Sequence, residues 1–238
     1  MCVIVFENWP SITGGMYVPK RSNVSGGTAK GERHFGRHWS YNLRDDPKRL
    51  AFVLARYRFA SKMACAGKRV LELGCSEGIG APILAELATK YTGIDMDGSA
   101  ISAAKENFRK KKYRFLKDDF LGKKYGVFDA VISMDVIEHI HKKFEPQFFS
   151  TVSKNLGNDG ICIIGTPNIT SEHYASPTSR LGHVNLYSSD RLKKTMQAVF
   201  HNVFIFSMND ETVHTGFAPM AHFLIGVGCF LKAKRVSK

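Results

Sequence analysis

The sequence lacks the features that mark secreted, membrane-spanning and metal-ribbon proteins. Its 238 residues include 5 cysteines, and none of them forms a Cys-x-x-Cys pair. We therefore expect neither a disulfide framework nor a zinc ribbon, and a reducing compartment fits. The longest apolar stretch, 222–231, is too short to span a bilayer, and residues 1–6 lack the basic start of a signal peptide. The sequence thus predicts a cytoplasmic protein without a transmembrane segment.

Acidic residues are scarce relative to basic ones. The chain has 34 Lys and Arg against 21 Asp and Glu, which gives a formal charge of +13. Between Lys20 and Arg69 there are 13 basic residues and 3 acidic ones. Because 11–46 is also rich in Gly and Ser, we interpret 1–46 as a basic arm or lid before a domain at 47–238. We expect it to steer an anionic substrate or membrane headgroups to the site. Charge that serves only solubility is the alternative interpretation.

Apolar runs with the length of strands alternate with helical stretches along most of the chain. The expected strands are 69–73, 91–95, 113–117, 128–134 and 160–165, and the expected helices are 47–64, 78–89, 98–111 and 136–156. This alternation predicts an α/β fold with a Rossmann-like, doubly wound and mostly parallel sheet. A capped helix at 189–200 and apolar runs at 203–207 and 222–231 then predict an antiparallel pair. We expect seven strands in one domain, with an antiparallel strand near the carboxyl end.

A glycine-spaced turn, Glu72-Leu73-Gly74-Cys75-Ser76-Glu77-Gly78, follows the first expected strand. Glycines at a strand-to-helix corner let the backbone approach a ligand, although such corners also occur for packing alone. The order acidic-x-Gly-x-Ser-x-Gly departs from the dinucleotide fingerprint, and a carboxylate at Glu72 would repel a diphosphate but suit a sulfonium or ammonium. Asp95, at the end of the next strand, is placed to accept two ribose hydroxyls. The turn therefore predicts a nucleoside cofactor and disfavours a dehydrogenase.

These motifs resemble those of class I S-adenosylmethionine-dependent methyltransferases over roughly residues 50 to 230. The resemblance implies that Glu72, Gly74 and Gly78 surround the methionine part and ribose of S-adenosylmethionine (SAM). It implies that Asp95 binds the ribose and that the next residue, Met96, also belongs to the cofactor site.

The segment 115–120 resembles the third motif of the same family. The resemblance implies that an acid there binds the adenine amino group while a neighbouring apolar side chain, Phe120, covers the ring. We prefer Asp118 for the acid, with Asp119 as the second choice.

The fourth expected strand runs into Asp135-Val136-Ile137-Glu138-His139-Ile140, beyond the strand end where open α/β sheets bind ligands. If a helix begins there, Asp135, Glu138 and His139 share one face and His141 points elsewhere. Two carboxylates and one imidazole are half of an octahedral site that suits Mg²⁺, Mn²⁺ or Fe²⁺. The loop 166–187 contains two histidines that are candidates for a missing ligand, His173 and His183.

Segment 180–188 resembles the part of metal-dependent small-RNA ribose methyltransferases that supplies a distal histidine, and the acid-x-x-Glu-His piece also resembles ubiquinone-pathway O-methyltransferases. On that resemblance Asp135, Glu138, His139 and His183 hold one Mg²⁺ or Mn²⁺. Asp135 stands where those families usually carry Glu, so it is the least secure ligand. Without a metal, His139 or His183 is the general base, and with Glu138 they form the expected catalytic group.

Three stretches, 13–19, 56–60 and 166–183, resemble O-methyltransferases of bacterial surface-polysaccharide biosynthesis. This resemblance implies O-methylation of a small anionic or sugar-type acceptor in capsule or lipopolysaccharide synthesis. The alternative function is ribose 2′-O-methylation of RNA, although no RNA-binding module is recognisable and aromatic residues are not interleaved with the basic ones. A catalytically inactive SAM-binding protein is a second alternative.

Overall fold

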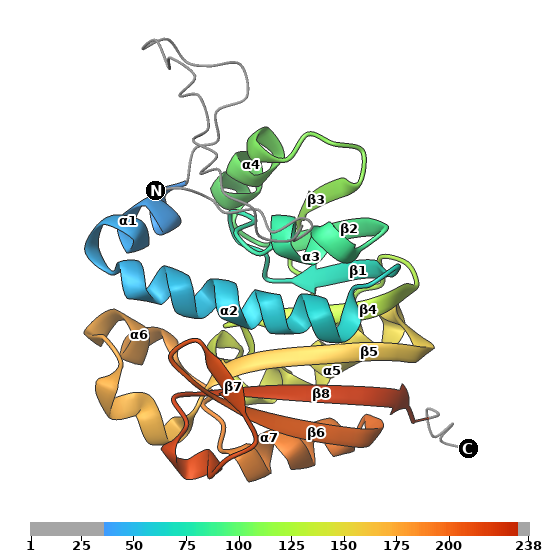
Figure 1. Ribbon diagram of the computed structural model, residues 1–238. Helices are drawn as coiled ribbons and strands as arrows, with labels where there is room; N and C mark the ends of the chain where they lie inside the picture. Colours follow the sequence, from blue (N-terminus) through green and yellow to red (C-terminus); the bar gives the residue numbers. More distant parts are fainter. Residues whose placement is uncertain (1–35, 233–238) are drawn as a thin grey trace, which may run out of the picture. The chain divides into compact units, whose positions relative to one another are not determined.

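The computed structural model describes residues 36–232, shown in Figure 1. Its helices are α1 (Arg37–Asp45), α2 (Pro47–Ala64), α3 (Ala81–Leu87), α4 (Gly98–Asn107), α5 (Glu145–Asn155), α6 (Pro177–Gly182) and α7 (Ser189–Gln197). Short 3₁₀ turns are η1 (Ile137–His139), η2 (Lys142–Phe144), η3 (Ile169–Tyr174) and η4 (Ala218–Met220). Its strands are β1 (Arg69–Leu73), β2 (Lys90–Asp95), β3 (Tyr113–Lys117), β4 (Phe128–Met134), β5 (Leu156–Pro167), β6 (Phe200–Asn209), β7 (Thr212–His214) and β8 (Phe223–Leu231). The predicted α/β fold is confirmed.

The strands form one sheet in the order β3-β2-β1-β4-β5-β8-β6-β7. Strands β1 to β5 are parallel, while β6, β7 and β8 join as antiparallel strands. The expected count of seven strands is wrong, because the described residues contain an eighth, β7, which pairs with β6 across a turn where Asp210 has a φ of +51°. The chain leaves β1 toward β3 and returns to β4 on the other side of β1. That reversal creates the topological switch point at which such sheets bind ligands.

Helices cover both faces of the sheet, as a doubly wound fold requires. Successive side chains of a strand point to opposite faces, so Val70 packs in one core and Leu71 in the other. The first core contains buried side chains of α2, α3 and α4, and the second contains those of α5 and α7. In Figure 1, α2 crosses the sheet on the near side. No helix between residues 36 and 232 combines the length and the apolar run that crossing a bilayer requires.

Helix α2 matches its predicted bounds, with Pro47 at its start and Val53, Tyr57 and Ala60 buried on one side. The preceding helix α1 falls inside the predicted arm, and its Trp39 is buried in the first core. The rest of the predicted arm, 1–35, lies outside the described residues together with the stretch 13–19. The boundary at residue 46 therefore stays a prediction.

The helix predicted over 136–156 is wrong over residues 136–144. Two 3₁₀ turns, η1 and η2, follow β4, and the α-helix begins only at Glu145. The non-glycine Asp135 has a φ of +55°, which α-helical backbone does not allow. Pro146 occupies the first turn of α5, where its missing N–H leaves no helical bond unmade. The shared helical face expected for Asp135, Glu138 and His139 is therefore absent.

Candidate active site

A cavity of about 450 Å³ lies beyond the carboxyl ends of the parallel strands at the switch point. Its walls divide by strand of origin. The β1–β3 side is formed by Gly74, Ser76, Asp95, Met96, Asp119 and Phe120. The β4 side is formed by Asp135, His139 and His141, and α1 and α2 add Trp39, Arg49 and Tyr57.

Gly74 places the turn against the cavity. Its φ is +79°, and a Cβ built on it would lie 2.2 Å from Val136 Cγ2, so glycine is required on both counts. Its backbone N–H donates to the carbonyl of Ile94 at 2.8 Å, which fixes the turn to the end of β2. Gly78 does not line the cavity; it lets the turn approach α4, where a Cβ would lie 3.3 Å from Ala104 Cβ.

Asp95 lines the cavity at the end of β2, as its position in the sequence predicts. Its Oδ2 accepts the backbone N–H of Ser76 at 2.8 Å, and its Oδ1 accepts that of Asp97 at 2.9 Å. These two bonds fix the carboxylate, and further lone pairs stay available because a carboxylate accepts about four hydrogen bonds. The next residue, Met96, is exposed beside it on the wall.

The two acids after β3 have different surroundings. Asp118 accepts from Lys123 Nζ at 2.5 Å and from Tyr125 Oη at 2.9 Å, and the lysine holds the pKa of its carboxyl below the usual range. Asp119 and the buried Phe120 line the cavity, whereas Asp118 does not. The geometry thus favours Asp119 over the preferred Asp118 for contact with a ligand.

Glu72 is buried beneath the turn and is not on the cavity wall. Tyr57 Oη donates to its Oε1 at 2.6 Å, and the Tyr91 hydroxyl donates to its Oε2. Burial raises the pKa of Glu72 to about 7, against the opposing effect of the two tyrosine hydroxyls. The sequence suggested that the Glu72 carboxylate repels a diphosphate and suits a sulfonium. That interpretation does not apply directly, because Tyr57 lines the cavity and binds this carboxylate, which does not reach the wall.

On the β4 side, Asp135 faces an arginine from α2. Arg56 Nη1 donates to Oδ1 of Asp135 at 2.8 Å and to Oδ2 at 2.7 Å. The same guanidinium lies over the ring of Phe223, 3.6 Å from its centroid. The predicted set of four metal ligands is therefore not brought together, since the Asp135 carboxylate is held in an ion pair.

The other three predicted ligands do converge. Atoms of Glu138, His139 and His183 that are able to bind a metal lie within 4.8 Å of one another. The fully buried Glu138 accepts from Thr166 Oγ1 at 3.0 Å through Oε2, while its Oε1 has no hydrogen-bond partner among the described residues. Burial, reinforced by the charge of Asp135, raises the pKa of Glu138 to about 8.

The two histidines differ in what fixes them. His139 Nδ1 lies 2.9 Å from the carbonyl oxygen of Gly182, and because a carbonyl only accepts, the neutral ring carries its proton on Nδ1 and a lone pair on Nε2. Burial lowers the pKa of His183, and the neighbouring His139 lowers it further. His173, the other candidate, stacks instead on Tyr174 and is absent from this group.

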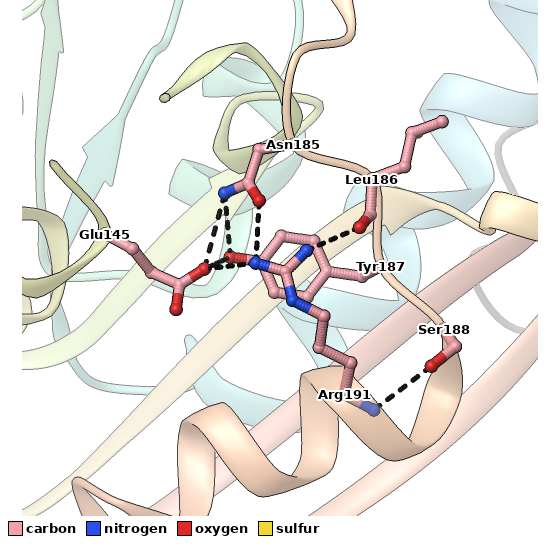
Figure 2. Close-up of polar contacts among 6 residues, drawn as sticks. All are labelled: Glu145, Asn185, Leu186, Tyr187, Ser188 and Arg191. Carbon is pink, nitrogen blue, oxygen red and sulfur yellow. Dashed lines mark hydrogen bonds and ion pairs between the residues drawn. The ribbon is translucent and has the colours of Figure 1, made fainter. Parts of the chain in front are cut away.

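A network of polar side chains anchors the segment that carries His183 (Figure 2). Arg191 Nη2 donates to Glu145 Oε2 and to Asn185 Oδ1, each at 2.7 Å, and the buried Tyr187 donates its hydroxyl to the same Glu145 oxygen. The backbone N–H of Asn185 donates to the carbonyl of Glu138 at 3.0 Å. The network therefore ties α5, α7 and the segment between α6 and α7 to the turn that holds Glu138.

Sequence reasoning missed several cavity residues. Arg49, Val53 and Tyr57 recur every fourth position on α2, so helical periodicity predicts a shared face but not that this face reaches the cavity. Trp39 comes from the segment interpreted as an arm. The expectation that His141 points elsewhere is wrong, because the 3₁₀ turn brings it to the cavity wall.

Comparison with known proteins places this fold and cavity in a family. Residues 38–199, more than half of the chain, match the family described as "Methyltransferase domain". The chain belongs to this family. The match begins inside α1 and ends just before β6, so it contains both sides of the cavity.

Curated relatives of this methyltransferase cover different shares of it. It is 32% identical over 104 residues to a probable S-adenosylmethionine-dependent methyltransferase of Mycolicibacterium smegmatis. The aligned stretch covers 44% of this chain and 40% of that protein. It is 29% identical over 199 residues to a ubiquinone biosynthesis O-methyltransferase of Chromobacterium violaceum. That alignment covers 70% of this chain and 81% of the relative. The chain spans about half the length of the first relatives it matches.

Solved structures of other methyltransferases share the fold. A TehB-like SAM-dependent methyltransferase from Corynebacterium glutamicum superposes with a TM-score of 0.61 at 19% identity, covering 81% of this chain and 96% of that one. The complex of DhpI with S-adenosylhomocysteine (SAH) gives a TM-score of 0.61 at 17% identity, covering 80% of this chain and 90% of that one. At these identities the likeness concerns the fold alone.

Proposed function

We propose that this methyltransferase transfers the methyl group of SAM to an oxygen of a small acceptor, with His139 as general base. One observation carries the proposal: the His139 ring lies on the cavity wall with Nδ1 bound to the Gly182 carbonyl, so Nε2 carries the lone pair that accepts a proton. The oxygen acceptor is supported by the curated relatives named as ubiquinone biosynthesis O-methyltransferases.

The β1–β3 side fits the nucleoside of SAM. Gly74 brings the backbone of the turn to the cavity wall, the fixed Asp95 carboxylate offers acceptors for ribose hydroxyls, and Phe120 offers an apolar surface for the adenine ring. Asp119 offers the acceptor for the adenine amino group. When bound, SAM supplies a methyl group that is already activated on a sulfonium.

The chain therefore has two chemical tasks, which are to orient the acceptor hydroxyl and to take up its proton. His139 takes the proton at Nε2 and becomes an imidazolium, whose charge is stabilised by the hydrogen bond from Nδ1–H to the Gly182 carbonyl. His183 does not line the cavity, but its ring lies next to that of His139, with the centroids 5.1 Å apart, and burial lowers its pKa, which favours the neutral ring. Val53, Ile140 and Phe144 line the cavity with apolar surface and limit the access of water.

A divalent cation fits the same group in part. Glu138, His139 and His183 supply one carboxylate and two imidazoles, and the buried Oε1 of Glu138, which has no hydrogen-bond partner in the part of the chain that the structure describes, is a suitable ligand atom. These three residues would hold Mg²⁺ or Mn²⁺, and such an ion lowers the pKa of a hydroxyl that it binds. The Arg56–Asp135 pair opposes a fourth protein ligand at Asp135.

The acceptor class stays a prediction from the sequence resemblance. A surface-glycan precursor with an anionic or sugar-type group is the first choice, and the ribose of RNA is the alternative. Both acceptors present a hydroxyl, so both are compatible with proton removal by His139.

The test is transfer of isotopically labelled methyl from SAM to a panel of hydroxyl acceptors that includes sugars, sugar phosphates, catechols and short RNAs. His139→Gln is expected to lower kcat about 10²- to 10⁴-fold while leaving S-adenosylhomocysteine affinity unchanged. His173→Gln, an exposed histidine outside the group, is the matched control. Equal activity of the two variants would refute the base assignment.

Chelation separates the two routes for proton removal. If a cation takes part, EDTA abolishes transfer and Mn²⁺ or Mg²⁺ restores it. Full activity after chelation leaves only the metal-free base mechanism.

A further inference from the structure

The glycine turn after β1 contains one acid that the proposed reaction does not use, Glu77. Its side chain is buried, and its Oε2 accepts the backbone N–H of Trp39, in the first turn of α1, at 3.2 Å. The two residues are 38 positions apart in the chain. This hydrogen bond therefore joins the turn directly to the helix that precedes α2.

Glu77 supplies the bond that an N-cap side chain makes in other helices. The first N–H groups of a helix have no partner within the helix, and a Ser, Thr, Asp or Asn at the N-cap commonly accepts one of them. The N-cap residue of α1 is Gly36, which has no side chain to do so. Trp39 is the third residue of α1, the usual donor to an N-cap side chain, and a carboxylate also suits the positive end of the helix dipole.

Gly36 is what allows the carboxylate to reach the helix. A Cβ built on Gly36 would lie 2.3 Å from Cδ of Glu77 and 2.3 Å from its Oε1, so a side chain there would displace the carboxylate. The backbone of Gly36 is extended, with a φ of −67° and a ψ of −177°, which residues with a Cβ adopt freely. The need for glycine at this position therefore comes from the contact with Glu77 and not from the backbone.

The contact holds one wall of the cavity in place. Trp39 is buried and lines the cavity, and α1 leads directly into α2, which supplies further wall residues (Figure 1). On the other side of the contact, Ser76 precedes Glu77, lines the same cavity and donates its N–H to Asp95. Helix α1 is thus fixed to α2 at its carboxyl end and to the glycine turn at its amino end. A ligand beside Asp95 has this helix as one of its walls.

We propose that Glu77 is a positioning residue, which holds α1 against the glycine turn so that the cofactor leaves the cavity only when this contact opens. The inference rests on the proposed function in one respect, since it takes the β1–β3 side as the cofactor site. It involves neither the acceptor nor His139. Because the contact lies at the end of a helix, it opens without disturbing the sheet.

The experiment breaks the contact from each of its two sides in the full chain. Glu77→Ala removes the acceptor, and Gly36→Ala adds the Cβ that displaces it. Glu77→Gln keeps an acceptor oxygen at the same length. The controls are Glu86→Ala, an exposed acid on α3, and Gly157→Ala, where the nearest atom to a Cβ is 3.5 Å away.

Two quantities are measured for each variant. The first is the rate at which bound, radiolabelled S-adenosylhomocysteine exchanges with an excess of the unlabelled compound. The second is the quenching by acrylamide of Trp39 fluorescence in the same complex, with Trp9→Phe present throughout to remove the other tryptophan. Quenching reports how far α1 uncovers Trp39, and exchange reports how fast the cofactor product leaves.

We expect Glu77→Ala and Gly36→Ala to exchange S-adenosylhomocysteine about fivefold or more faster than the unsubstituted protein, with stronger quenching of Trp39, because an N-cap bond corresponds to a factor of this size. Glu77→Gln should stay within about twofold of the unsubstituted protein, since it keeps the hydrogen bond. Both controls should leave exchange and quenching unchanged.

Unchanged exchange or unchanged quenching in Glu77→Ala overturns the proposal. A cap that only stabilises the fold would give this result, with a lower urea midpoint as the single effect. If Glu77→Ala does not fold, Gly36→Ala decides, and its agreement with Gly157→Ala overturns the proposal. No acceptor is present in these measurements, so a failure to detect methyl transfer refutes the proposed function and leaves the role of Glu77 standing.

Discussion

The two sides of the cavity are built by different means. On the β1–β3 side, Asp95 is held by two backbone N–H groups, those of Ser76 and Asp97, and the turn depends on the positive φ of Gly74. All of these residues belong to one strand–helix–strand unit. The geometry of the turn and of Asp95 is therefore a local property of about 30 residues, which is the usual size of such a unit, whereas Asp119 and Phe120 follow β3.

On the β4 side the contacts join side chains from segments far apart in the chain. Arg56 and Asp135 are 79 residues apart, and His139 binds a carbonyl 43 residues away. Buried Glu138 accepts a hydrogen bond from Thr166 of β5, and its other carboxylate oxygen has no partner within residues 36–232. The comparison teaches that the geometry around Asp95 depends on one local unit, while the geometry around Asp135 and His139 depends on tertiary packing.

Gly74 is where the two sides meet, and its substitution is expected to have the largest effect. Gly74→Ala adds backbone strain at a φ of +79° and a Cβ that overlaps Val136, the residue that precedes η1. We expect a loss of about 2–5 kcal/mol in the free energy of unfolding, with weaker S-adenosylhomocysteine binding.

Gly67→Ala is the control for that substitution. Gly67 has a φ of +69°, but a Cβ there meets nothing within 4 Å, so it tests strain alone at about 1–2 kcal/mol. Urea unfolding measures the free energy of unfolding of both variants. Equal losses would show that the contact with Val136 does not couple the two sides.

Glu72 tests whether burying a carboxylate beneath the glycine turn lowers the free energy of unfolding. Its pKa is about 7 in the folded protein and 4.5 ordinarily, so between these values the unfolded chain releases a proton that the folded protein keeps. The contribution of Glu72 to stability is therefore present below pH 4.5 and is lost as the pH rises to about 7.

Glu72→Gln removes this dependence while keeping a group that hydrogen-bonds the two tyrosines. Relative to the unsubstituted protein, the variant is expected to gain about 2–3 kcal/mol of unfolding free energy between pH 4.5 and 8, most of it by pH 7. Urea unfolding across this range checks it, with the exposed Glu86→Gln as control. A difference that is flat with pH would contradict a raised pKa.

The sequence predicts the sheet well because strand signals are local. The strands at 69–73, 113–117 and 128–134 and the helix at 47–64 have the predicted bounds, since short apolar runs and a proline at the helix start carry the information. The segment after β4 was not predictable in the same way. Its apolar spacing also suits an α-helix, whereas in the structure Asp135 has a positive φ and α5 begins only at Glu145, with Pro146 in its first turn.

The features of the candidate site also divide into those that the sequence predicts and those that it does not. The cavity positions of Gly74, Asp95 and Phe120 follow from their places at strand ends, whereas the ion pair of Arg56 with Asp135 has no signal in the sequence. The choice between Asp118 and Asp119 depends on where Lys123 and Tyr125 fold, and the sequence does not reveal this.

The acids of the β1–β3 side provide the next test. Asp95→Ala is expected to weaken SAM binding by about 1–3 kcal/mol, through lost hydrogen bonds to a charged group. Asp119→Ala should weaken it less, and Asp118→Ala should leave it unchanged, because Asp118 faces Lys123 instead of the cavity. Calorimetric titration of S-adenosylhomocysteine ranks the three, and a larger effect of Asp118→Ala than of Asp119→Ala would reverse the assignment.

The smallest expected effect comes from the network that anchors the His183 segment. Arg191→Met keeps the apolar stem but removes the bonds to Glu145, Asn185 and the Leu186 carbonyl. Because this network fixes the β4 side alone, we expect kcat/KM to fall about fivefold, near 1 kcal/mol, with S-adenosylhomocysteine affinity unchanged. Arg58→Met, which removes an exposed pair with Glu86, should change neither quantity. Equal loss of cofactor affinity and turnover in Arg191→Met would mean that the two sides are one cooperative unit, and the distinction between local and tertiary construction would not hold.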